Sequence, residues 1–467
     1  MAIIIIFLIL CRTFTVSNAE SSSERPVSSR KVRISREWIK IWPESENTYL
    51  LGISGGPEES VYLALNNLDF SDGSSQINIT YFGGDGSIYW EKEVSVSKPW
   101  RRSGSRSQSA SSNMTGALYL VGSIGNNWSD EAGVVVRIEP NGSLSWESGW
   151  GGDERGYFQA VAIVNTDDVI AAGGTLNSDD SRSGLLVQFS PTGEQLWNYT
   201  WNGTDSAYKT EFHSVAIGPT DEIYAAGTIR GPAIIAREAL LVAKFDQMGQ
   251  IRWNITSGIQ CTGSSCSVSI LDCVARPSGG VLILGYRMDG QGPKIFSLAL
   301  NDDGSQDELQ IWDTEESTGT NLWLTALASF EEENYLAVGS KTETIYEPPF
   351  EYNGSLYMVV LDQNGKSISN ETWSQPQDLF GEGIVQGESH SYYITGHIGN
   401  WLYRTEDWFM ARLHIELIDL LGNRDFLIPI IVSSLIVASI IALTLGGLGL
   451  FARMHRRKKK TDPNEIY

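Results

Sequence analysis

The segment that decides the fold runs from Glu222-Ile-Tyr-Ala-Ala-Gly227 through Leu241-Val-Ala-Lys-Phe-Asp-Gln-Met-Gly249 to Trp253. Its first part is a short apolar run ending in glycine, which predicts a β-strand that reaches a crowded or sharply turning position. Its second part predicts a strand that enters an Asp-x-x-Gly turn, because Asp and Gly favour tight turns. A strand carrying Trp253 follows, so the segment predicts three consecutive antiparallel strands.

This pattern recurs along most of the chain. The glycine-terminated strand occurs at intervals of 51 to 58 residues, apart from one interval of 70. An apolar run such as Phe158–Val164 precedes it, so each unit supplies four strands. The glycines are Gly52, Gly122, Gly173, Gly227, Gly285, Gly339 and Gly396, and the strand after the turn carries Trp90, Trp146, Trp197, Trp253, Trp312 and Trp373.

Seven units of four antiparallel strands predict an all-β fold, a seven-bladed β-propeller of four-stranded blades over residues 31–415. One blade cannot bury both of its faces alone, whereas neighbours stacked around an axis can. We expect the glycines to lie where strands crowd. The regular recurrence of the tryptophans favours packing between blades, and a sugar-binding platform is the alternative.

The ends of the repeat array predict how the ring closes. Arg36–Gly52 aligns without gaps on Tyr157–Gly173, which predicts that the first unit begins with its innermost strand. The last unit lacks a clear fourth strand after Trp408–Ile415, so we expect Lys31–Ser35 to supply it and to remove a bare edge. The Ser/Arg-rich stretch Arg101–Ser112 fills the long interval and is interpreted as a flexible insertion.

At these repeats the chain resembles the extracellular β-propeller repeat family usually labelled SBBP. The closest matches are Lys244-Phe-Asp-Gln-Met-Gly-Gln-Ile-Arg-Trp253 and Trp146-Glu-Ser-Gly-Trp-Gly-Gly-Asp153, which follow the family's Lys-Phe-Asp-x-x-Gly and Trp/Gly-Gly pattern. The resemblance covers roughly residues 31–415 and is sharp in units two to four. It implies a propeller fold and a surface location, and it implies no reaction.

The two ends of the chain predict export and a membrane anchor. Residues 1–19 combine an apolar run, Ile3–Leu10, with a small-residue cleavage pattern at Ser17-Asn-Ala19, which is typical of a secretory signal peptide. Residues 427–451 are uncharged and long enough to cross a bilayer as one transmembrane helix. A basic flank follows, and basic flanks stay cytoplasmic. We therefore expect a single-pass type I protein of the cell membrane that contacts membrane lipid through this helix. Residues 416–426 would form a juxtamembrane linker, and residues 452–467 a basic cytoplasmic tail.

Charge and cysteines agree with an extracellular location. The formal net charge is −22, which argues against a nucleic-acid partner because phosphate backbones attract basic surfaces. Cys261 and Cys266 bracket a short loop that a disulfide would close in an oxidising exterior. Cys273 lies in an apolar run and is interpreted as a buried hydrophobe, although its pairing with either of the other two stays open.

Potential N-glycosylation sequons are frequent in the predicted ectodomain. Each has the form Asn-x-Ser/Thr, and several fall on predicted turns, which fits an exported glycoprotein. The asparagines are Asn78, Asn113, Asn127, Asn141, Asn198, Asn202, Asn254, Asn353 and Asn370.

The sequence contains no recognisable catalytic motif, metal-ligand spacing or cofactor motif. If a ligand binds, the loops that enter the innermost strands are expected to gather near the axis on one face. Three of these loops are Gly151–Gly156, Asn202–Thr210 and Ser374–Gly383. The polar candidates for ligand binding are Asp153, Glu154, Arg155, Asp205 and Lys209.

The sequence therefore favours a non-enzymatic, membrane-anchored propeller that acts as a receptor-like or adhesion-type ectodomain. Its partner would be an extracellular protein or a glycan. Two alternatives are an extracellular propeller hydrolase or lyase acting on polysaccharide, and a structural component of the cell envelope. A hydrolase would need a pair of carboxylates in a central pocket.

Overall fold

The computed structural model describes residues 30–419 with gaps, and within this range Val32–Glu416 form one compact unit. The elements described are all β-strands. Among these residues there is no helix with the length and apolar character needed to cross a bilayer. The predicted signal peptide, transmembrane helix and tail lie outside the described residues, as does most of the predicted linker. The gaps are 44–47, 69–74, 103–107, 127–129, 151–154, 177–180, 202–208, 232–237, 258, 260–266, 290–291, 314–319, 332, 346–350, 375–377, 389 and 400–406.

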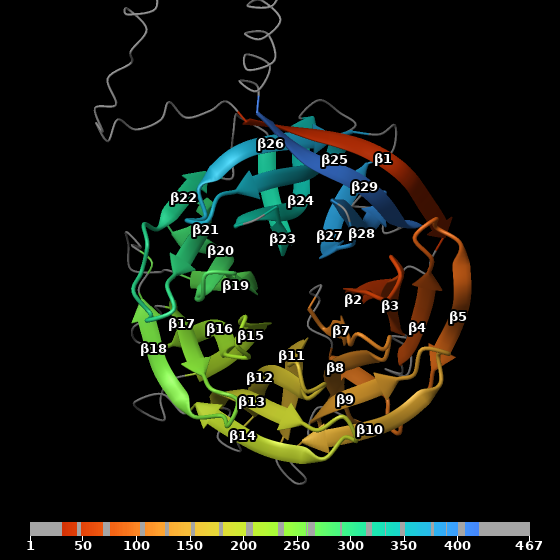
Figure 1. Cartoon of the computed structure of the whole chain (residues 1–467), viewed down its shortest axis with the longest axis vertical. Coiled ribbons are helices and arrows are strands. Elements are labelled where there is room, and N and C mark those ends of the chain that lie inside the picture. Colours follow the sequence, from red (N-terminus) through yellow and green to blue (C-terminus); the bar gives the residue numbers. More distant parts are fainter. Residues whose placement is uncertain are drawn as a thin grey trace, which may run out of the picture. The chain divides into compact units, whose positions relative to one another are not determined.

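The described strands form seven antiparallel sheets arranged around a common centre, which confirms the all-β, seven-bladed propeller (Figure 1). Blade 1 consists of β2 (Thr48–Gly55), β3 (Val61–Leu68), β4 (Ser75–Phe82) and β5 (Ile88–Val94). Blade 2 consists of β6 (Trp100–Arg102) and β7 (Ala110–Ser112), both paired with β8 (Leu118–Ile124), then β9 (Ala132–Ile138) and β10 (Leu144–Trp150). Blade 3 consists of β11 (Arg155–Ile163), β12 (Val169–Leu176), β13 (Arg182–Phe189) and β14 (Gln195–Trp201).

The remaining blades repeat this order from the centre outward. Blade 4 consists of β15 (Lys209–Ile217), β16 (Ile223–Arg230), β17 (Glu238–Phe245) and β18 (Ile251–Ser257). Blade 5 consists of β19 (Ser267–Ala275), β20 (Val281–Asp289), β21 (Gly292–Leu300) and β22 (Gln310–Asp313). Blade 6 consists of β23 (Thr320–Phe330), β24 (Asn334–Ile345), β25 (Glu351–Leu361) and β26 (Ser367–Trp373). Blade 7 consists of β27 (Leu379–Gln386), β28 (Ser391–Ile398), β29 (Asp407–Asp419) and β1 (Arg30–Pro43).

Burial follows the position of each strand in its blade. Most second and third strands are buried on both faces, as in β8, because neighbouring blades cover each side; in β4 only one face is buried. The outer strand β14 instead alternates between exposed and half-buried residues, as a strand with one covered face does. Apolar clusters fill the space between blades, and Phe212, Val215 and Leu241 of blade 4 pack there against Ile170 and Leu186 of blade 3.

The repeated glycine marks a close approach of two strands. The register of β15 and β16 shifts after the Phe212–Gly227 pair, which defines a β-bulge. A Cβ on Gly227 would lie 1.9 Å from the carbonyl oxygen of Glu211, so no larger residue fits without movement. Gly173, Gly339 and Gly396 have equally close backbone neighbours. The expectation that these glycines lie where strands crowd is confirmed.

Four of the repeated tryptophans join one blade to the next. Trp146, Trp197 and Trp253 each lie over the turn glycine of the following blade and donate an Nε1–H bond to a carbonyl oxygen of that turn. Trp90 does the same across blades 1 and 2, where its Nε1 lies 2.9 Å from the oxygen of Pro140. These four tryptophans therefore pack between blades as expected, and the sugar-platform alternative does not apply to them.

The ring closes through β1, which is the outermost strand of blade 7 and pairs with β29. The expected outer strand is confirmed, and it extends well beyond Lys31–Ser35. The prediction that Arg36 begins the innermost strand of the first unit is wrong. Gly52 lies in β2, which is itself the innermost strand of blade 1, and Trp38 of β1 donates to the carbonyl of Gly84 at 2.8 Å. Trp38 thus joins blade 7 to blade 1 as Trp90 joins blade 1 to blade 2.

The interpretation of Arg101–Ser112 as a flexible insertion is wrong for its described residues. Gln108–Ser112, called the axial segment below, continues into β7, and Ser109 and Ala110 are buried. The oxygen of Gln108 accepts from the backbone N–H of Val161 in blade 3 at 2.9 Å. Gly52 of blade 1 forms a β-bridge with Gln108.

The side chain of Gln108 continues these contacts to further blades. Its Oε1 accepts from Ser214 Oγ of blade 4 at 2.6 Å, and its Nε2 donates to Asp272 and to the carbonyl of Cys273 in blade 5. Asp272 Oδ2 in turn accepts from the N–H of Leu327 in blade 6 at 2.8 Å. Gln108 thus contacts the innermost strands of blades 1, 3, 4 and 5, so the axial segment links these strands to one another.

Candidate functional site

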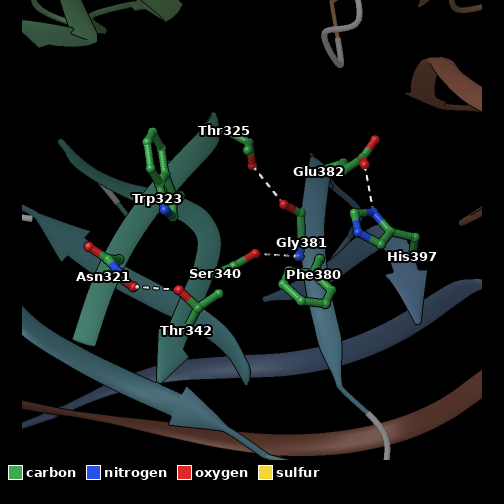
Figure 2. Close-up of a pocket in the computed structure, with 9 residues that line it drawn as sticks. All are labelled: Asn321, Trp323, Thr325, Ser340, Thr342, Phe380, Gly381, Glu382 and His397. Atoms are coloured by element: carbon green, nitrogen blue, oxygen red, sulfur yellow. Dashed lines mark hydrogen bonds and ion pairs between the residues drawn. The ribbon is translucent and has the colours of Figure 1, made fainter. Parts of the chain in front are cut away.

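A pocket of about 480 Å³ opens between blades 6 and 7. This volume lies within the usual range for small-ligand sites. Figure 2 shows Trp323 on one side and Phe380 with His397 on the other. The lining residues are Asn321, Trp323, Thr325, Ser340, Thr342, Phe380, Gly381, Glu382 and His397.

The geometry of the strands places each of these side chains on one of the two walls of the pocket. Asn321, Trp323 and Thr325 alternate along β23, so they share one face of the strand. Ser340 and Thr342 stand beside them, because β24 pairs Ser340 with Trp323 and Thr342 with Asn321. The opposite wall comes from β27 and β28 of blade 7.

Two β-bulges direct residues towards the pocket. The register of β23 shifts between Leu324 and Ala326, so Thr325 is the extra residue of a bulge. The register of β27 shifts between Gly381 and Gly383, so Glu382 occupies the equivalent place in blade 7. Bulges commonly re-aim a side chain beside a functional site. Thr325 Oγ1 donates to the carbonyl of Gly381 at 3.0 Å, which ties the two walls together.

Glu382 and His397 form a polar pair at the blade 7 wall. Nδ1 of His397 lies 2.7 Å from Oε1 of Glu382. The imidazole stacks on Phe380 with ring centroids 4.7 Å apart and 12° between the planes. The His397 side chain is 12 % exposed and that of Glu382 is 29 % exposed. The stacked ring is therefore held in place, while the carboxylate stays accessible from the pocket.

Trp323 is the most exposed part of the lining. It is 44 % exposed, although an aromatic residue of this size is usually well buried. Its ring contacts Tyr286 of blade 5 with centroids 5.5 Å apart. Contact on one side fixes the indole, and its exposure leaves an aromatic surface for a ligand.

A second polar cluster lies between blades 3 and 4. Arg182 forms an ion pair with Glu211, and His213 bonds to Gln159 at 2.9 Å and to Thr228 at 3.0 Å. Burial acts to raise the pKa of Glu211, but the hydrogen bond from Arg182 and the charge of His213 outweigh it, so the pKa is lowered overall. These groups satisfy one another, which identifies the cluster as a structural link between the two blades.

The predicted ligand residues fall at the ends of innermost strands or outside the described residues. Arg155 is the first residue of β11 and is half-buried, and Lys209 is the exposed first residue of β15. Asp153, Glu154 and Asp205 lie outside the described residues. Arg155 and Lys209 belong to blades 3 and 4, whereas the pocket lies between blades 6 and 7. One predicted ligand loop, Ser374–Gly383, does contribute Phe380, Gly381 and Glu382 to the pocket lining.

Neither Trp323 nor His397 was among the candidates predicted from the sequence. The sequence did contain a signal for Trp323. It lies between the outer-strand tryptophans Trp312 and Trp373, at a place where the repeat predicts no tryptophan. Glu382 and His397 come from two strands of one blade, and nothing in their spacing distinguishes them from other polar residues.

The predicted modification sites divide into described and undescribed positions. Cys261, Cys266, Asn127 and Asn202 lie outside the described residues, and so does the side chain of Asn353. Cys273 is a buried free thiol whose Sγ lies 2.9 Å from Ser214 Oγ, as expected for a buried residue that takes no part in a disulfide. Among the described residues, no group of three or more His, Cys, Asp or Glu side chains is arranged to hold a metal ion.

No family model matches the chain, and no curated protein sequence matches it. Solved structures with a similar fold include a protein of unknown function from Dyadobacter fermentans, with 11 % identity, 82 % of this chain and 99 % of that chain covered, and a TM-score of 0.46. The propeller domain of the trilobed protease from Pyrococcus furiosus has 9 % identity, with 79 % and 94 % covered and a TM-score of 0.43.

An α-L-arabinofuranosidase from Fusarium graminearum has 13 % identity, with 68 % of this chain and 96 % of that chain covered and a TM-score of 0.43. These values are too low for any activity of those proteins to be transferred to this chain. The resemblance to the SBBP family likewise stays a prediction.

Proposed function

We propose that this protein is a non-enzymatic binding protein of the cell surface, and that the pocket between blades 6 and 7 holds one sugar residue of an extracellular glycan. The observation that carries the proposal is the half-exposed indole of Trp323, which lines the same pocket of about 480 Å³ as an accessible carboxylate, Glu382.

A pyranose fits the chemistry of these walls. One face of the sugar ring presents C–H groups, which pack on an aromatic ring, and its edges present hydroxyl groups that need hydrogen-bond partners. Trp323 supplies the aromatic ring. Glu382 Oε1 faces His397, so Oε2 would accept from a sugar hydroxyl, while the carboxamide of Asn321 would both donate and accept.

The negative charge of the chain and of the pocket restricts the kinds of sugar that are expected to bind. The chain carries a net charge of −22, and Glu382 is the acidic group of the pocket lining. A sialic or uronic acid would meet like charge on approach and in the pocket. Neutral hexoses or amino sugars are therefore the expected ligands.

The lining also favours binding over hydrolysis. Glycoside hydrolases of the common type place two carboxyl groups across the scissile bond. Of the nine lining residues, Glu382 alone has a carboxyl group. Placement at the cell surface is supported by the sequence, in which an uncharged span at 427–451 precedes a basic segment.

The test uses the full-length chain, purified in detergent, on an array of neutral, amino and acidic glycans, with titration calorimetry of each hit. Replacing Trp323 with alanine is expected to weaken binding about tenfold, because aromatic stacking contributes about 1.5 kcal/mol. Tyr89→Ala is the matched control, since Tyr89 is 58 % exposed on the outer strand β5.

Two results would contradict the proposal. One is a full array on which no neutral or amino sugar binds, even if an extracellular protein does. The other is a sugar whose affinity falls equally in the Trp323→Ala and Tyr89→Ala variants. Release of reducing sugar from a bound polysaccharide would instead support the hydrolase alternative.

A further inference from the structure

One register position recurs in the middle of the outer strands and carries two kinds of residue. It directly follows the register position that Trp90, Trp146, Trp197 and Trp253 hold in blades 1 to 4. In blade 6 Ser369 holds that position, and the strand pairings align the five blades. In blades 1 and 2 the recurring position holds a glutamate, and in blades 3, 4 and 6 it holds the asparagine of a sequon. The residues are Glu91, Glu147, Asn198, Asn254 and Asn370.

The three asparagines point into solvent. Asn198, Asn254 and Asn370 are exposed, and they pair with Val187, Ala243 and Val359 of the third strand. The hydroxyl residue of each sequon lies two positions further on, on the same face of the strand. Thr200 and Thr256 are exposed as well.

These outer strands present open edges. In the described part of the chain, β14 pairs with β13, β18 with β17, and β26 with β25, and each is the last strand of its sheet. A free edge offers unpaired N–H and C=O groups to another chain, and natural proteins often block it with charge. β5 has three consecutive charged residues, Glu91, Lys92 and Glu93, whereas β14 reads Gln-Leu-Trp-Asn-Tyr-Thr-Trp without any charge.

We propose that N-linked glycans on Asn198, Asn254 and Asn370 block the outer edges of blades 3, 4 and 6, in place of the exposed carboxylate that Glu91 supplies in blade 1. In blade 2 the half-buried Glu147 instead accepts from the backbone N–H and the hydroxyl of Ser97. Neighbouring strands in a sheet lie about 4.8 Å apart. A branched glycan at the middle of an outer strand extends much further than this, so it prevents a strand of a second copy from adding to the edge. The exposed Leu196 beside Asn198 makes the edge of blade 3 the most vulnerable.

The sequon at Asn113 provides an internal contrast. Asn113 is 8 % exposed, and its Oδ1 accepts from the N–H of Ala117 at 2.8 Å and from Thr115 Oγ1 at 2.9 Å. A glycan on this buried side chain would break the turn, so the folded protein is expected to leave Asn113 unmodified. The proposal rests on export of the chain and is independent of the pocket.

The experiment expresses the full-length chain in a host that glycosylates secreted proteins, and measures occupancy by peptide mass spectrometry. Three variants each change all three sites together. Two of them replace the asparagines, one with glutamine and the other with glutamate. The third combines Thr200→Ala, Thr256→Ala and Thr372→Ala, so it removes each sequon but keeps its asparagine. Light scattering after size-exclusion chromatography gives the oligomer fraction, and thermal unfolding shows whether each variant is folded.

We expect the three sites to be occupied in the wild type. We also expect the oligomer fraction of the Asn→Gln and Thr→Ala triples to be severalfold larger than that of the wild type. The Asn→Glu triple should stay monomeric, because it restores an exposed carboxylate like that of Glu91 in blade 1. Unoccupied sites in the wild type would overturn the proposal, and so would Gln and Ala triples as monomeric as the wild type. If the Glu triple associates as strongly as the Gln triple, charge does not replace the glycan and the parallel with Glu91 fails.

Discussion

Replacing Trp38 with alanine tests how the ring is held closed. Trp38 lies on β1, joins blade 7 to blade 1, and is half-buried between Phe82 and Tyr393, with centroids 6.4 Å and 6.0 Å away. It also covers Gly86, where an added Cβ would lie 2.9 Å from the indole. Its Nε1–H donates to the carbonyl of Gly84 at 2.8 Å.

The expected loss follows from these contacts. A fully buried aromatic residue costs about 3–5 kcal/mol when truncated to alanine, and half-burial reduces this to roughly 2 kcal/mol. The lost hydrogen bond adds about 1 kcal/mol. We therefore expect the free energy of unfolding to fall by about 3 kcal/mol for Trp38→Ala. Trp38→Phe keeps most of the packing, so we expect a fall of about 1 kcal/mol.

Urea titration of the full-length chain in detergent, followed by circular dichroism, measures both variants against the wild type. Trp90→Ala is the matched control, because Trp90 makes the same contact between blades 1 and 2, within the continuous chain. Limited proteolysis should cut β1 faster in Trp38→Ala than in Trp90→Ala, since the lost contact frees the outer strand that closes the ring. A loss below about 1 kcal/mol, or equal proteolysis of β1 in both variants, would refute this account of closure.

Three further predictions concern the ring and its links. Gly227→Ala should lower the free energy of unfolding by about 3 kcal/mol in urea titration, because its Cβ would lie 1.9 Å from the oxygen of Glu211. Gln108→Ala should cost a similar amount in the same assay, since it removes a partner of the buried Asp272, and a loss of less than about 1 kcal/mol would contradict the central role of the axial segment. The folded-state pKa of Glu211 is lowered, so its contribution to stability is present above the unfolded value near 4.5 and is lost as the pH falls through the folded value. Glu211→Gln should therefore lose less stability than the wild type between pH 5 and about pH 3, and equal losses would contradict the assignment.

The propeller could be predicted from the sequence because each blade repeats the same physical requirements. Gly227 and Gly173 are needed at the same bulge, and Trp197 and Trp253 cover the same turn of the next blade. The start of the ring could not be placed, because Arg36–Gly52 has the length of two paired strands but contributes to two different blades. Trp38 was the signal that could have shown this. The repeated tryptophans lie on outer strands, so Trp38 indicated that its own strand is an outer strand.

The pocket could not be predicted in the same way, because it depends on departures from the repeat. Trp323 stands where other blades have no tryptophan. Glu382 is a bulge residue whose equivalents in blades 3 and 4 are Gln159 and His213, and these two bond to each other. A pattern that identifies what the blades share cannot show which blade differs from the others.

The axial segment explains why a ligand site would lie between two blades. Many innermost strands meet at the centre of a propeller, and their side chains could converge there on a ligand. In this chain Gln108 occupies that place and bonds with groups from blades 4 and 5. These bonds already engage groups of the innermost strands, whereas the pocket between blades 6 and 7 has walls that a ligand can contact. The gap between blades 6 and 7 is bridged by Thr325 and Gly381, so a ligand there would contact walls whose separation is fixed before it binds.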